Sequence, residues 1–587
     1  MNYDLNQFTG QKAEKNATYK ALQKLLALIK DDHRTLTLAF IAVLVNSGLT
    51  LLGPTIIGYT IDNYVVTKQF DSVLRNASLL LGMYVVALGT GYTQTRLMGG
   101  VGQRTLFKLR NAVFTKLQEL PVAFFNQNKA GDLISRVNND TDKLNLFFAQ
   151  SLMQFIGSIA MMIGSALFLL FVDLPLGAAA LAPALLAWLF TLATSAWVKQ
   201  KNAINLKSVG GMSAEIQESL NNFKVIVAFN RRDYFRKRFA EVNQQNYQTA
   251  VKAGLANNIF MPVYSFSAQL GQLIVLSFGI YLIATNRFSI GLLISFLSYV
   301  NNFYNPLRQL ATLWSGFQVA LAGWDRISQL LSLQTNLQTI HDTSNKTSSA
   351  LLAFQNVSFG YPNGREVLHT ISFELERGKT YALVGPTGGG KTTTASLIAR
   401  LYDPTSGVVL LDGRDIRSYT PQERTQKIGF ILQEPFLFTG TVRDNLLYGN
   451  EQYQHYSNEQ LATVIRDANL KGLLERFDDG LDTKVQASGE AVSLGQKQLI
   501  AFMRAVLRNP DLLILDEATA NIDTVTEQLL GEILTNLPER TTRIVIAHRL
   551  NTIESADEIF FINTGEVTRA GSLQDAVEML LHGKRIS

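Results

Sequence analysis

Six long stretches without a charged side chain lie in the first part of the chain and limit its fold more than any other feature. They cover residues 35–61, 76–95, 144–172, 174–198, 253–286 and 288–307. About 20 residues with a rise of about 1.5 Å each cross the roughly 30 Å hydrocarbon core of a bilayer. Each stretch therefore predicts a membrane-spanning helix, and the longer ones predict tilt or extension beyond the bilayer. We expect the last helix to continue past Arg308 through Trp324.

Basic residues between these stretches predict how the helices are oriented. Lys and Arg are abundant in residues 104–143 and 199–252, whereas the opposite connections hold Lys68, Arg75 and Arg287. Basic loops remain in the cytoplasm, so the amino terminus and the carboxy-terminal domain are expected there, in a multi-pass protein of the cytoplasmic membrane. Much of the net charge of +6 follows from this topology, and nucleic acid is not an expected partner.

The amino-terminal segment and the absence of cysteine indicate how the chain enters the membrane and which kinds of chemistry it lacks. Residues 1–30 are polar and charged and lack the short apolar core of a cleaved secretory signal, so the first stretch is expected to direct insertion itself. The chain has no cysteine, which excludes disulfides, thiolate metal sites and cysteine-protease chemistry.

A glycine-rich loop in the second half of the chain predicts a nucleotide site. It follows the apolar run 381–384, precedes a helical run that reaches Arg400, and consists of Gly385, Pro386, Thr387, Gly388, Gly389, Gly390, Lys391 and Thr392. Strand, loop and helix are the context in which this motif binds phosphate. Backbone N–H groups and the helix N-terminus would face the phosphates, Lys391 would reach the outer ones, and Thr392 would hold Mg²⁺.

Two carboxylates at the end of another apolar run predict hydrolysis as well as binding. Residues 512–515 deliver Asp516 and Glu517 to the end of a strand that we expect beside the phosphate-loop strand. Asp516 would bind Mg²⁺ through water, and Glu517 would act as general base on the attacking water. His548 follows the run 544–547 and could contact the terminal phosphate. Solvated acids and a structural histidine are the simpler alternatives, but the order of the motifs favours the catalytic roles.

Two further residues are candidates for contacts with the nucleotide and its metal ion. Gln433 follows the run 428–432, and its amide could ligate Mg²⁺ weakly. The loop 434–438 carries apolar side chains that we expect to be exposed and to meet another domain. Tyr361, beside Pro362, could stack on adenine, although an aromatic residue at a turn proline more often packs in a core.

The two long basic segments predict helices that extend out of the membrane. Apolar residues recur at helical spacing in the first, at Leu106, Leu109, Val113 and Leu117. Residues 121–140 in the first segment, and 218–230 in the second, could dock onto another domain. A solvated helical hairpin explains them equally well.

A polar segment rich in Thr, Asn, Ser and Gln divides the chain after residue 333. It predicts a transmembrane domain at 1–333, a linker at 334–350 and a nucleotide-binding domain at 351–587. The predicted fold class is multi-domain, with an all-α six-helix transmembrane domain followed by an α/β P-loop ATPase domain.

Together these motifs resemble the ABC exporter half-transporters, in which a six-span membrane domain is fused to a nucleotide-binding domain. The resemblance covers nearly the whole chain and implies that two such subunits bind two ATP molecules between them. Residues 125–140 and 207–229 resemble the intracellular loops that press on the nucleotide-binding domains. The resemblance assigns ATP and Mg²⁺ binding to Tyr361, the loop Gly385 to Thr392, Thr393, Gln433 and Asp516, catalysis to Glu517 and His548, and the D-loop to Asp523.

Two motifs depart from the family pattern. Where the family has Leu-Ser-Gly-Gly-Gln, this chain has Val492, Ser493, Leu494, Gly495 and Gln496. Leucine thus replaces a glycine that lies close to nucleotide, and the freedom of glycine to adopt positive φ is lost. The D-loop has Ala-Asn-Ile-Asp at 520–523 instead of Ser-Ala-Leu-Asp. Both features resemble the catalytically complete subunit of heterodimeric multidrug exporters, and Ser493, Gly495 and Gln496 would then face the partner's ATP.

The leading hypothesis is ATP-driven export of amphiphilic small molecules across the lipid bilayer by alternating access. A lipid flippase and a nucleotide-gated channel or regulatory sensor are the alternatives, and a soluble ATPase that handles DNA is excluded if extraction needs detergent. The last two spans contain Phe266, Phe296, Tyr299, Phe303 and Tyr304 with several asparagines and no acid. Such a surface suits amphiphilic substrates, although aromatic residues in membrane helices also pack and anchor the helices.

Overall fold

The computed structural model describes residues 3–5, 30–334, 337, 339–340, 350–362, 364–486, 492–516, 524–546 and 553–582. Contacts divide the chain into two units. The helical unit comprises Gly10–Lys116 and Gly131–Ser332, and the α/β unit comprises Met1–Thr9, Leu117–Ala130 and Leu333–Ser587. Two segments that precede the predicted linker, Met1–Thr9 and Leu117–Ala130, thus belong with the α/β unit.

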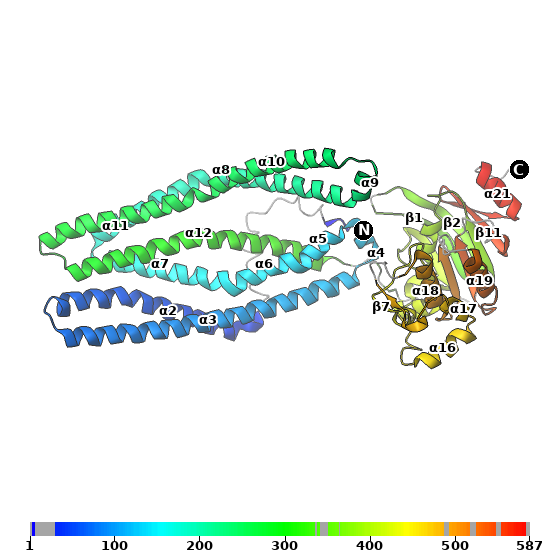
Figure 1. The fold of residues 1–587 in the computed structure, drawn as a ribbon, viewed down its shortest axis with the longest axis horizontal. Helices are drawn as coiled ribbons and strands as arrows, with labels where there is room; N and C mark the ends of the chain where they lie inside the picture. Colours follow the sequence, from blue (N-terminus) through cyan, green and yellow to red (C-terminus); the bar gives the residue numbers. More distant parts are fainter. Residues whose placement is uncertain are drawn as a thin grey trace. The chain divides into compact units, whose positions relative to one another are not determined.

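Long helices make up the helical unit and run lengthwise beside one another (Figure 1). They are α2 (His33–Thr60), α3 (Phe70–Glu119), α7 (Leu152–Val172), α8 (Leu174–Asn221), α10 (Arg232–Asn258), α11 (Phe260–Ala284) and α12 (Ile290–Ser332). The short helical turn η2 (Lys30–Asp32) precedes α2, and the other short helical elements lie between the long helices, namely η3 (Ile61–Val65), α5 (Ala130–Ser135), η4 (Arg136–Asp140), α6 (Thr141–Leu146), η5 (Phe147–Ser151) and α9 (Phe223–Ala228). The predicted extension of the basic segments as helices, and of the last helix past Arg308 through Trp324, is confirmed.

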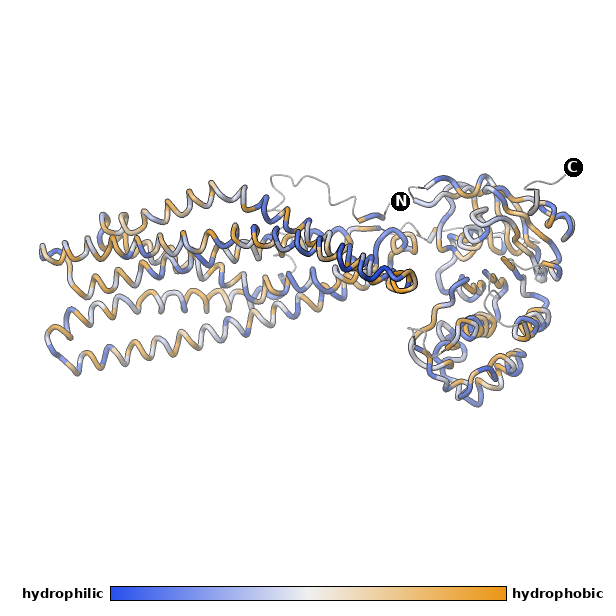
Figure 2. Tube along the Cα trace, turned by 45° about the horizontal axis from the view of Figure 1, so that its top comes forward, coloured by the Kyte–Doolittle hydropathy of each residue, from blue (hydrophilic) through white to orange (hydrophobic). Residues whose placement is uncertain are grey.

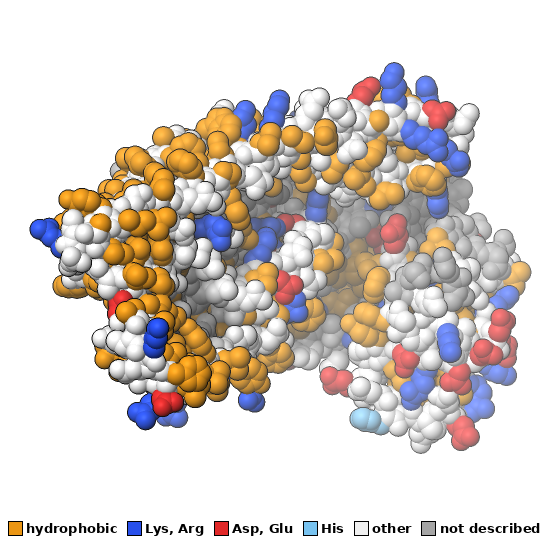
Figure 3. Space-filling model, turned by 60° about the vertical axis from the view of Figure 1, so that its left-hand side comes forward, with side chains coloured by type: hydrophobic (Ala, Val, Ile, Leu, Met, Phe, Trp, Pro, Cys, Tyr) orange, Lys and Arg blue, Asp and Glu red, His pale blue; other side chains and the backbone are white. Residues whose placement is uncertain are grey.

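The surface of this unit is strongly apolar. Among the described residues, five helical segments are long and apolar enough to cross a membrane, namely Lys30–Val65, Phe70–Glu119, Ala130–Val172, Leu174–Asn221 and Arg232–Ala284. The sixth predicted span forms the first part of α12. Hydrophobic residues concentrate in the part of the helical unit away from α9 (Figure 2), and hydrophobic side chains cover much of the visible surface of the unit (Figure 3). Such a surface fits contact with lipid.

Helix α12 is central to the helical unit because it packs against α2, α7 and α11. It approaches α2 closely where Gly58 faces Gly291, since a Cβ atom on Gly291 would lie 2.0 Å from the Gly58 carbonyl oxygen. The carboxylate of Asp62 accepts a hydrogen bond from the Gly291 N–H at 2.8 Å. These contacts hold the start of α12 against the end of α2.

The α/β unit contains a six-stranded sheet whose order is β12, β11, β3, β10, β9 and β6. Its strands are β3 (Thr380–Val384), β6 (Ile428–Ile431), β9 (Leu512–Asp516), β10 (Thr542–Ile546), β11 (Glu558–Asn563) and β12 (Glu566–Ala570). Neighbouring strands from β11 to β6 are parallel, and β12 is antiparallel to β11. The carboxyl ends of the parallel strands therefore lie along one edge of the sheet, where α/β proteins bind ligands.

A second sheet and a group of helices complete this unit. The sheet has the order β2, β1, β4 and β5, with β1 (Ala350–Gly360), β2 (Glu366–Glu376), β4 (Ser406–Leu411) and β5 (Arg414–Asp415), and a short pair is formed by β7 (Gly440–Thr441) and β8 (Lys484–Val485). The helices are α4 (Val122–Gln127), α13 (Lys391–Ile398), η6 (Ile416–Ser418), α14 (Pro421–Lys427), α15 (Val442–Leu446), α16 (Asn458–Asp467), α17 (Lys471–Leu474), η7 (Gly480–Asp482), α18 (Leu494–Val506), α19 (Thr524–Thr535) and α21 (Leu573–His582). Leu461, Phe502, Met503 and Leu515 belong to one buried core that joins the helices to the six-stranded sheet.

The strands predicted from apolar runs are confirmed as β3, β6, β9 and β10, but one predicted neighbour is wrong. The strand that ends at Asp516 does not lie beside the phosphate-loop strand, because β10 lies between β9 and β3. An apolar run predicts that a segment forms a buried strand. It does not predict the neighbours of that strand, because strand order depends on the connections between distant segments of the chain.

Candidate functional site

The glycine-rich loop lies at the carboxyl edge of the sheet, between β3 and α13. Lys391 is the first residue of α13 and is buried, and its ammonium donates hydrogen bonds to the carbonyl oxygens of Gly385 at 2.7 Å and of Pro386 at 3.0 Å. The side chain is therefore folded back across the loop that the sequence predicts to hold phosphate. A cation and a helix N-terminus in one loop favour an anion at this position.

Glycine is required at two positions of this loop for different reasons. Gly385 has φ +145° and lies so close to β11 that a Cβ atom would be 2.0 Å from the carbonyl oxygen of Ile562. Gly390 has φ +117°, which L-residues rarely adopt, and directly precedes α13. The strand β11 and the start of α13 thus confine the loop, and a side chain at either position would displace its backbone.

The loop meets the Asp516 strand through Thr392. The Thr392 hydroxyl donates to Asp516 Oδ1 at 3.4 Å, and Asp516 is buried at the end of β9. Helix α13 packs against β9, so this contact forms although β10 separates the two strands. A hydroxyl and a carboxylate are hard oxygen ligands of the kind that Mg²⁺ prefers. Thr392 and Asp516 fit a magnesium site, and Gln433 follows β6 at the same edge of the sheet.

Three predicted site residues, Glu517, Asp523 and His548, lie outside the described residues, and their roles stay predictions. The strands that lead to two of them are in register. Ile546 at the end of β10 pairs with Leu383 on one side and with Asp516 on the other. The ends of β3, β9 and β10 therefore lie at one level, and the chain continues from there into the phosphate loop, Glu517 and His548.

Tyr361 also lies at the phosphate loop, but its ring packs on a neighbour. Its hydroxyl is 3.1 Å from the Thr393 hydroxyl, one residue beyond Thr392. Its ring meets that of Tyr402 edge to face, with the centroids 5.3 Å apart. Both the predicted contact with the nucleotide site and the simpler packing role thus have support in the geometry.

Tyr402 links this aromatic group to the segment between α3 and α5. Helix α3 ends before Pro121, which lacks an N–H, and α4 follows. The Asn126 amide on α4 donates to the Tyr402 hydroxyl at 2.7 Å. Burial raises the pKa of Tyr402, so the hydroxyl stays neutral. The predicted docking of this segment is confirmed for α4, but at Tyr402, a residue that no sequence motif had indicated.

The apolar side chains of the loop after Gln433 are predicted to be exposed, which is wrong for Leu437, because this residue is buried in the core of the α/β unit. The loop is tied to α18, the helix that begins at the signature. Phe436 and Phe438 are exposed and meet edge to face at 5.3 Å. Buried Asn445 holds Phe438 by accepting from its N–H at 2.8 Å and donating to its carbonyl at 2.9 Å. Arg504 on α18 donates to the Phe436 carbonyl at 3.3 Å and to Asn445 Oδ1 at 3.0 Å. Burial lowers the pKa of Arg504, yet it remains charged at neutral pH because its reference value is so high.

The residues of the unusual signature begin helix α18. Ser493 is the N-cap, its hydroxyl accepts from the Gln496 N–H at 3.2 Å, and Gln496 Oε1 accepts from the Ser493 N–H at 2.9 Å. This capping box fixes the helix start. Leu494 is the first helical residue, its side chain is exposed, and neither it nor Gly495 is among the described residues with positive φ. The predicted backbone defect at Leu494 is therefore wrong, because an N1 residue has helical φ. The steric effect of its side chain on the partner's nucleotide stays a prediction.

The aromatic residues expected to form a substrate surface instead form a core. Phe296, Tyr299 and Tyr304 are buried in one cluster of the helical unit. The Tyr304 hydroxyl donates to the Ala180 carbonyl at 2.9 Å, and the Tyr299 ring stacks on Phe168 at 3.7 Å. Phe303 packs against the same cluster, whereas Phe266 is exposed. Buried packing thus explains most of this set.

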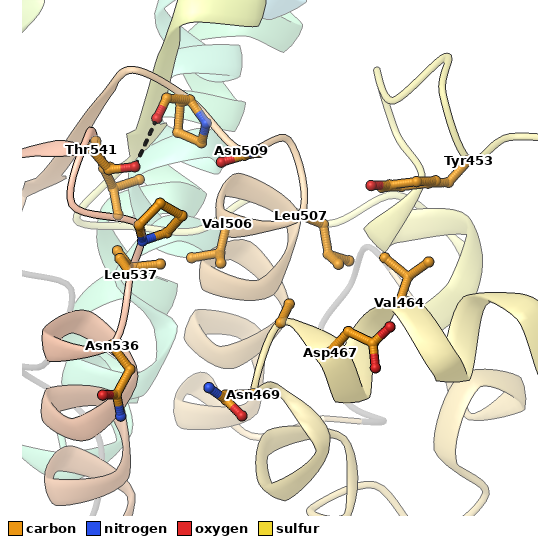
Figure 4. A pocket seen from close by; sticks show the side chains of 14 residues that line it. Tyr453, Val464, Asp467, Asn469, Val506, Leu507, Asn509, Asn536, Leu537 and Thr541 are labelled. Atoms are coloured by element: carbon orange, nitrogen blue, oxygen red, sulfur yellow. Dashed lines mark hydrogen bonds between the residues drawn. The ribbon is translucent and has the colours of Figure 1, made fainter.

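A pocket of 380 Å³ in the α/β unit lies between α16, the end of α18 and the residues after α19 (Figure 4). Its labelled side chains include Val464, Leu507 and Thr541, and Thr541 donates to the Pro510 carbonyl at 3.2 Å. None of the described residues that line it belongs to the phosphate loop or the signature. It therefore adds nothing to the nucleotide site.

Comparison with known proteins extends these observations. Residues 36–307 match the model of the ABC transporter transmembrane region, and residues 368–520 match that of the ABC transporter. The chain is 33% identical over 572 residues to the uncharacterised ABC transporter ATP-binding protein YfiC of Bacillus subtilis, which covers 97% of this chain and 94% of that protein. It is 32% identical over 508 residues to a fatty acid ABC transporter ATP-binding/permease protein of Mycobacterium tuberculosis, covering 86% and 79%. It is 30% identical over 578 residues to a multidrug resistance ABC transporter ATP-binding and permease protein of Lactococcus lactis, covering 97% and 96%.

Proposed function

The chain belongs to the ABC transporters and carries their transmembrane and ATP-binding regions in one polypeptide, and from this premise we propose that it is an ATP-driven exporter of amphiphilic compounds. It is a multi-pass membrane protein, and we place its amino terminus and α/β unit in the cytoplasm because the basic segments are expected there. The contact of Thr392 with Asp516 at the edge that holds the phosphate loop is the main support for ATP hydrolysis.

Each residue of the site has a distinct part in this proposal. When bound, Mg²⁺ neutralises phosphate charge, and Thr392, Gln433 and Asp516 would hold it. Lys391 and the loop N–H groups would bind the outer phosphates. Glu517 would accept a proton from the attacking water, and His548 would hold that water and the terminal phosphate in place. Closure of two ATP sites would rearrange the helical units, so that the substrate cavity changes from open to the inside to open to the outside.

The substrate class rests on the relatives as well as on the apolar helical unit. One relative is named for multidrug resistance and another for fatty acids, and both groups include amphiphiles. A screen for compounds that stimulate ATP hydrolysis by the reconstituted complex tests this class. Stimulation by amphiphilic compounds supports export, whereas hydrolysis that no amphiphile changes argues for a channel or sensor. Movement of labelled lipid between leaflets would favour a flippase.

The link between α4 and Tyr402 predicts a selective loss of coupling. Tyr402→Phe keeps the ring contact with Tyr361 and removes the hydroxyl that Asn126 binds. We expect the number of substrate molecules moved per ATP to fall about fivefold, the effect of one hydrogen bond of about 1 kcal/mol, while hydrolysis changes little. Paired transport and hydrolysis rates on the same proteoliposomes measure this ratio.

Tyr419→Phe is the matched control, because it also removes a buried hydroxyl, which donates to the Leu411 carbonyl at 2.7 Å within the same unit. It should leave the ratio of transport to hydrolysis unchanged. A parallel fall of both rates in Tyr402→Phe, with the ratio preserved, would show that the contact serves stability and not coupling.

We further propose that the working complex is a heterodimer. In a dimer of this family, the signature of one subunit completes the ATP site of the other, so Ser493 and the start of α18 would face ATP bound by the partner subunit. Exposed Leu494 adds a bulky side chain at this surface. A partner with a standard signature would complete the site built on Lys391, and Leu494 would affect the weaker site alone.

The heterodimer predicts that Leu494→Gly changes steady-state hydrolysis by less than about twofold, because most turnover occurs at the other site. In a homodimer the same change would relieve both sites and raise hydrolysis severalfold. Hydrolysis by the purified complex, with the mass of the copurified partner, distinguishes the two. Full substrate-stimulated hydrolysis and transport by this chain alone would rule the heterodimer out.

A further inference from the structure

A recess of 240 Å³ lies in the helical unit among α2, α3, α7 and α12. Amide and hydroxyl side chains from all four helices surround it, and they include Asn46, Thr50, Gln94, Gln154, Ser158 and Gln309. All but Gln309 belong to the uncharged stretches predicted to cross the membrane. Polar side chains within a membrane-spanning segment cost free energy to insert, and they usually mark a substrate path or a binding site.

The recess is built by helical spacing and not by a sequence motif. Asn46 and Thr50 lie one turn apart on α2, and Gln154 and Ser158 lie one turn apart on α7, so each helix presents a polar stripe at this point. Pro306 of α12 also lines the recess. It has no N–H to bond within the helix, and α12 can therefore bend there.

Part of this polar surface is already engaged in hydrogen bonds. Asn46 Nδ2 donates to the Ala87 carbonyl at 3.3 Å, and the Ser158 hydroxyl donates to Gln309 Oε1 at 3.4 Å. The side-chain amides of Gln94 and Gln154 make no hydrogen bond to any residue that the structure describes. These two amides offer both donors and acceptors to a bound molecule.

The charges around the recess exclude two classes of ligand. Its described lining contains no acidic, basic or histidine side chain. A cation would lose water without gaining a carboxylate, and a carboxylate would find no Lys or Arg, so either would pay the full desolvation cost. Met153 and Met161 supply an adaptable apolar wall. An uncharged molecule with an apolar body and an amide, ester or carbonyl group satisfies both kinds of lining.

We propose that this recess is a recognition subsite for uncharged amphiphiles that carry carbonyl or amide groups. The proposal rests on the proposed export function and adds its substrate class. A recess of this volume is below the roughly 300–1,000 Å³ of complete ligand pockets, so it holds one part of a substrate. The polar group of the substrate binds the amides of Gln94 and Gln154, and the apolar body extends along α2 and α7.

The test compares the effects of two dyes on ATP hydrolysis. It uses the full-length chain, purified together with its partner and reconstituted into membranes. Nile red is uncharged and carries a carbonyl, whereas ethidium is a permanent cation. We expect Nile red to stimulate ATP hydrolysis and ethidium to have little effect. Replacing both of these glutamines, as Gln94→Leu with Gln154→Leu, should raise the concentration of Nile red for half-maximal stimulation roughly tenfold, because two polar contacts are lost.

A substitution that adds one negative charge to the recess gives a second test, in which the preferred dye changes and function is not simply lost. Gln154→Glu keeps the size of the side chain and adds a carboxylate, so ethidium should gain stimulation while Nile red loses it. Gln272→Leu is the matched control, because Gln272 lies on α11, outside the recess, and donates to Asn301. It should shift the Nile red response by less than twofold.

The outcomes separate this proposal from the export function itself. Stimulation of the unaltered complex by ethidium alone overturns the substrate class and leaves export intact. An equal shift in Gln272→Leu and in the glutamine pair, or no exchange of dye preference in Gln154→Glu, also overturns the subsite. Stimulation by neither dye, together with the absence of ATP-dependent transport, counts against both proposals.

Discussion

Replacing Glu517 by Gln is expected to lower steady-state ATP turnover by roughly 10²–10⁴-fold, the usual contribution of a general base. The amide keeps the shape and hydrogen-bonding capacity of the side chain but cannot accept the proton of the attacking water. ATP should still bind, because the phosphate loop, Lys391 and Thr392 are unchanged. Steady-state hydrolysis and equilibrium binding of ATP, measured on the same preparation, check the two halves of this expectation.

Glu532→Gln on α19 is the matched control, since Glu532 is an exposed acid of the same unit. Its hydrolysis rate should equal that of the unaltered protein within about twofold. Near-normal turnover in Glu517→Gln would show that Glu517 is not the general base. Loss of ATP binding in that variant would show that the substitution acts before the chemical step.

Replacing Lys391 by Met should act earlier, on ATP binding. The Lys391 ammonium lies 2.7 Å from the Gly385 carbonyl and 3.0 Å from that of Pro386, so it is held at the loop that is predicted to receive phosphate. Hydrogen bonds to charged groups contribute about 1.5–3 kcal/mol, which predicts a roughly 10- to 100-fold loss of affinity for MgATP. Titration with a fluorescent ATP analogue measures this loss, and hydrolysis should fall with it.

Lys379→Met serves as the control because Lys379 precedes β3 at the opposite edge of the sheet. Its ammonium lies 2.8 Å from Glu376 in a surface ion pair, which contributes little to stability. ATP affinity should be unchanged in this variant. If Lys391→Met bound MgATP as tightly as Lys379→Met does, the phosphate would not reach Lys391 and the assignment of the loop would be wrong.

The parts of the fold that could be predicted from sequence are those with local physical causes. Long uncharged stretches became helices of the helical unit, and apolar runs became β3, β6, β9 and β10, because burial of apolar side chains acts on each segment separately. The order of the strands was not predictable in this way. Thr392 meets Asp516 through the packing of α13 on β9, and not through adjacent strands.

Single residues from distant segments were the hardest to predict. Tyr402 carries no motif of its own and acquires a role only because α4 is part of the α/β unit, where Asn126 donates to its hydroxyl. The polar recess likewise combines Gln94, Gln154 and Gln309 from three helices. The aromatic residues of the last spans were conspicuous in the sequence, yet Phe296 and Tyr299 pack in a core. Strong local signals thus indicate the elements, whereas the substrate contacts depend on how those elements assemble.

ATP-dependent transport by the reconstituted complex distinguishes an ATP-driven exporter from a passive pathway. Proteoliposomes with outward-facing α/β units are given MgATP and a fluorescent amphiphile outside, and accumulation of the dye inside is followed with time. We expect accumulation that requires hydrolysable ATP, continues against a concentration gradient and disappears in Glu517→Gln. Accumulation that stops when the dye concentrations are equal, or that is the same in Glu517→Gln, would show a passive pathway and contradict ATP-driven export.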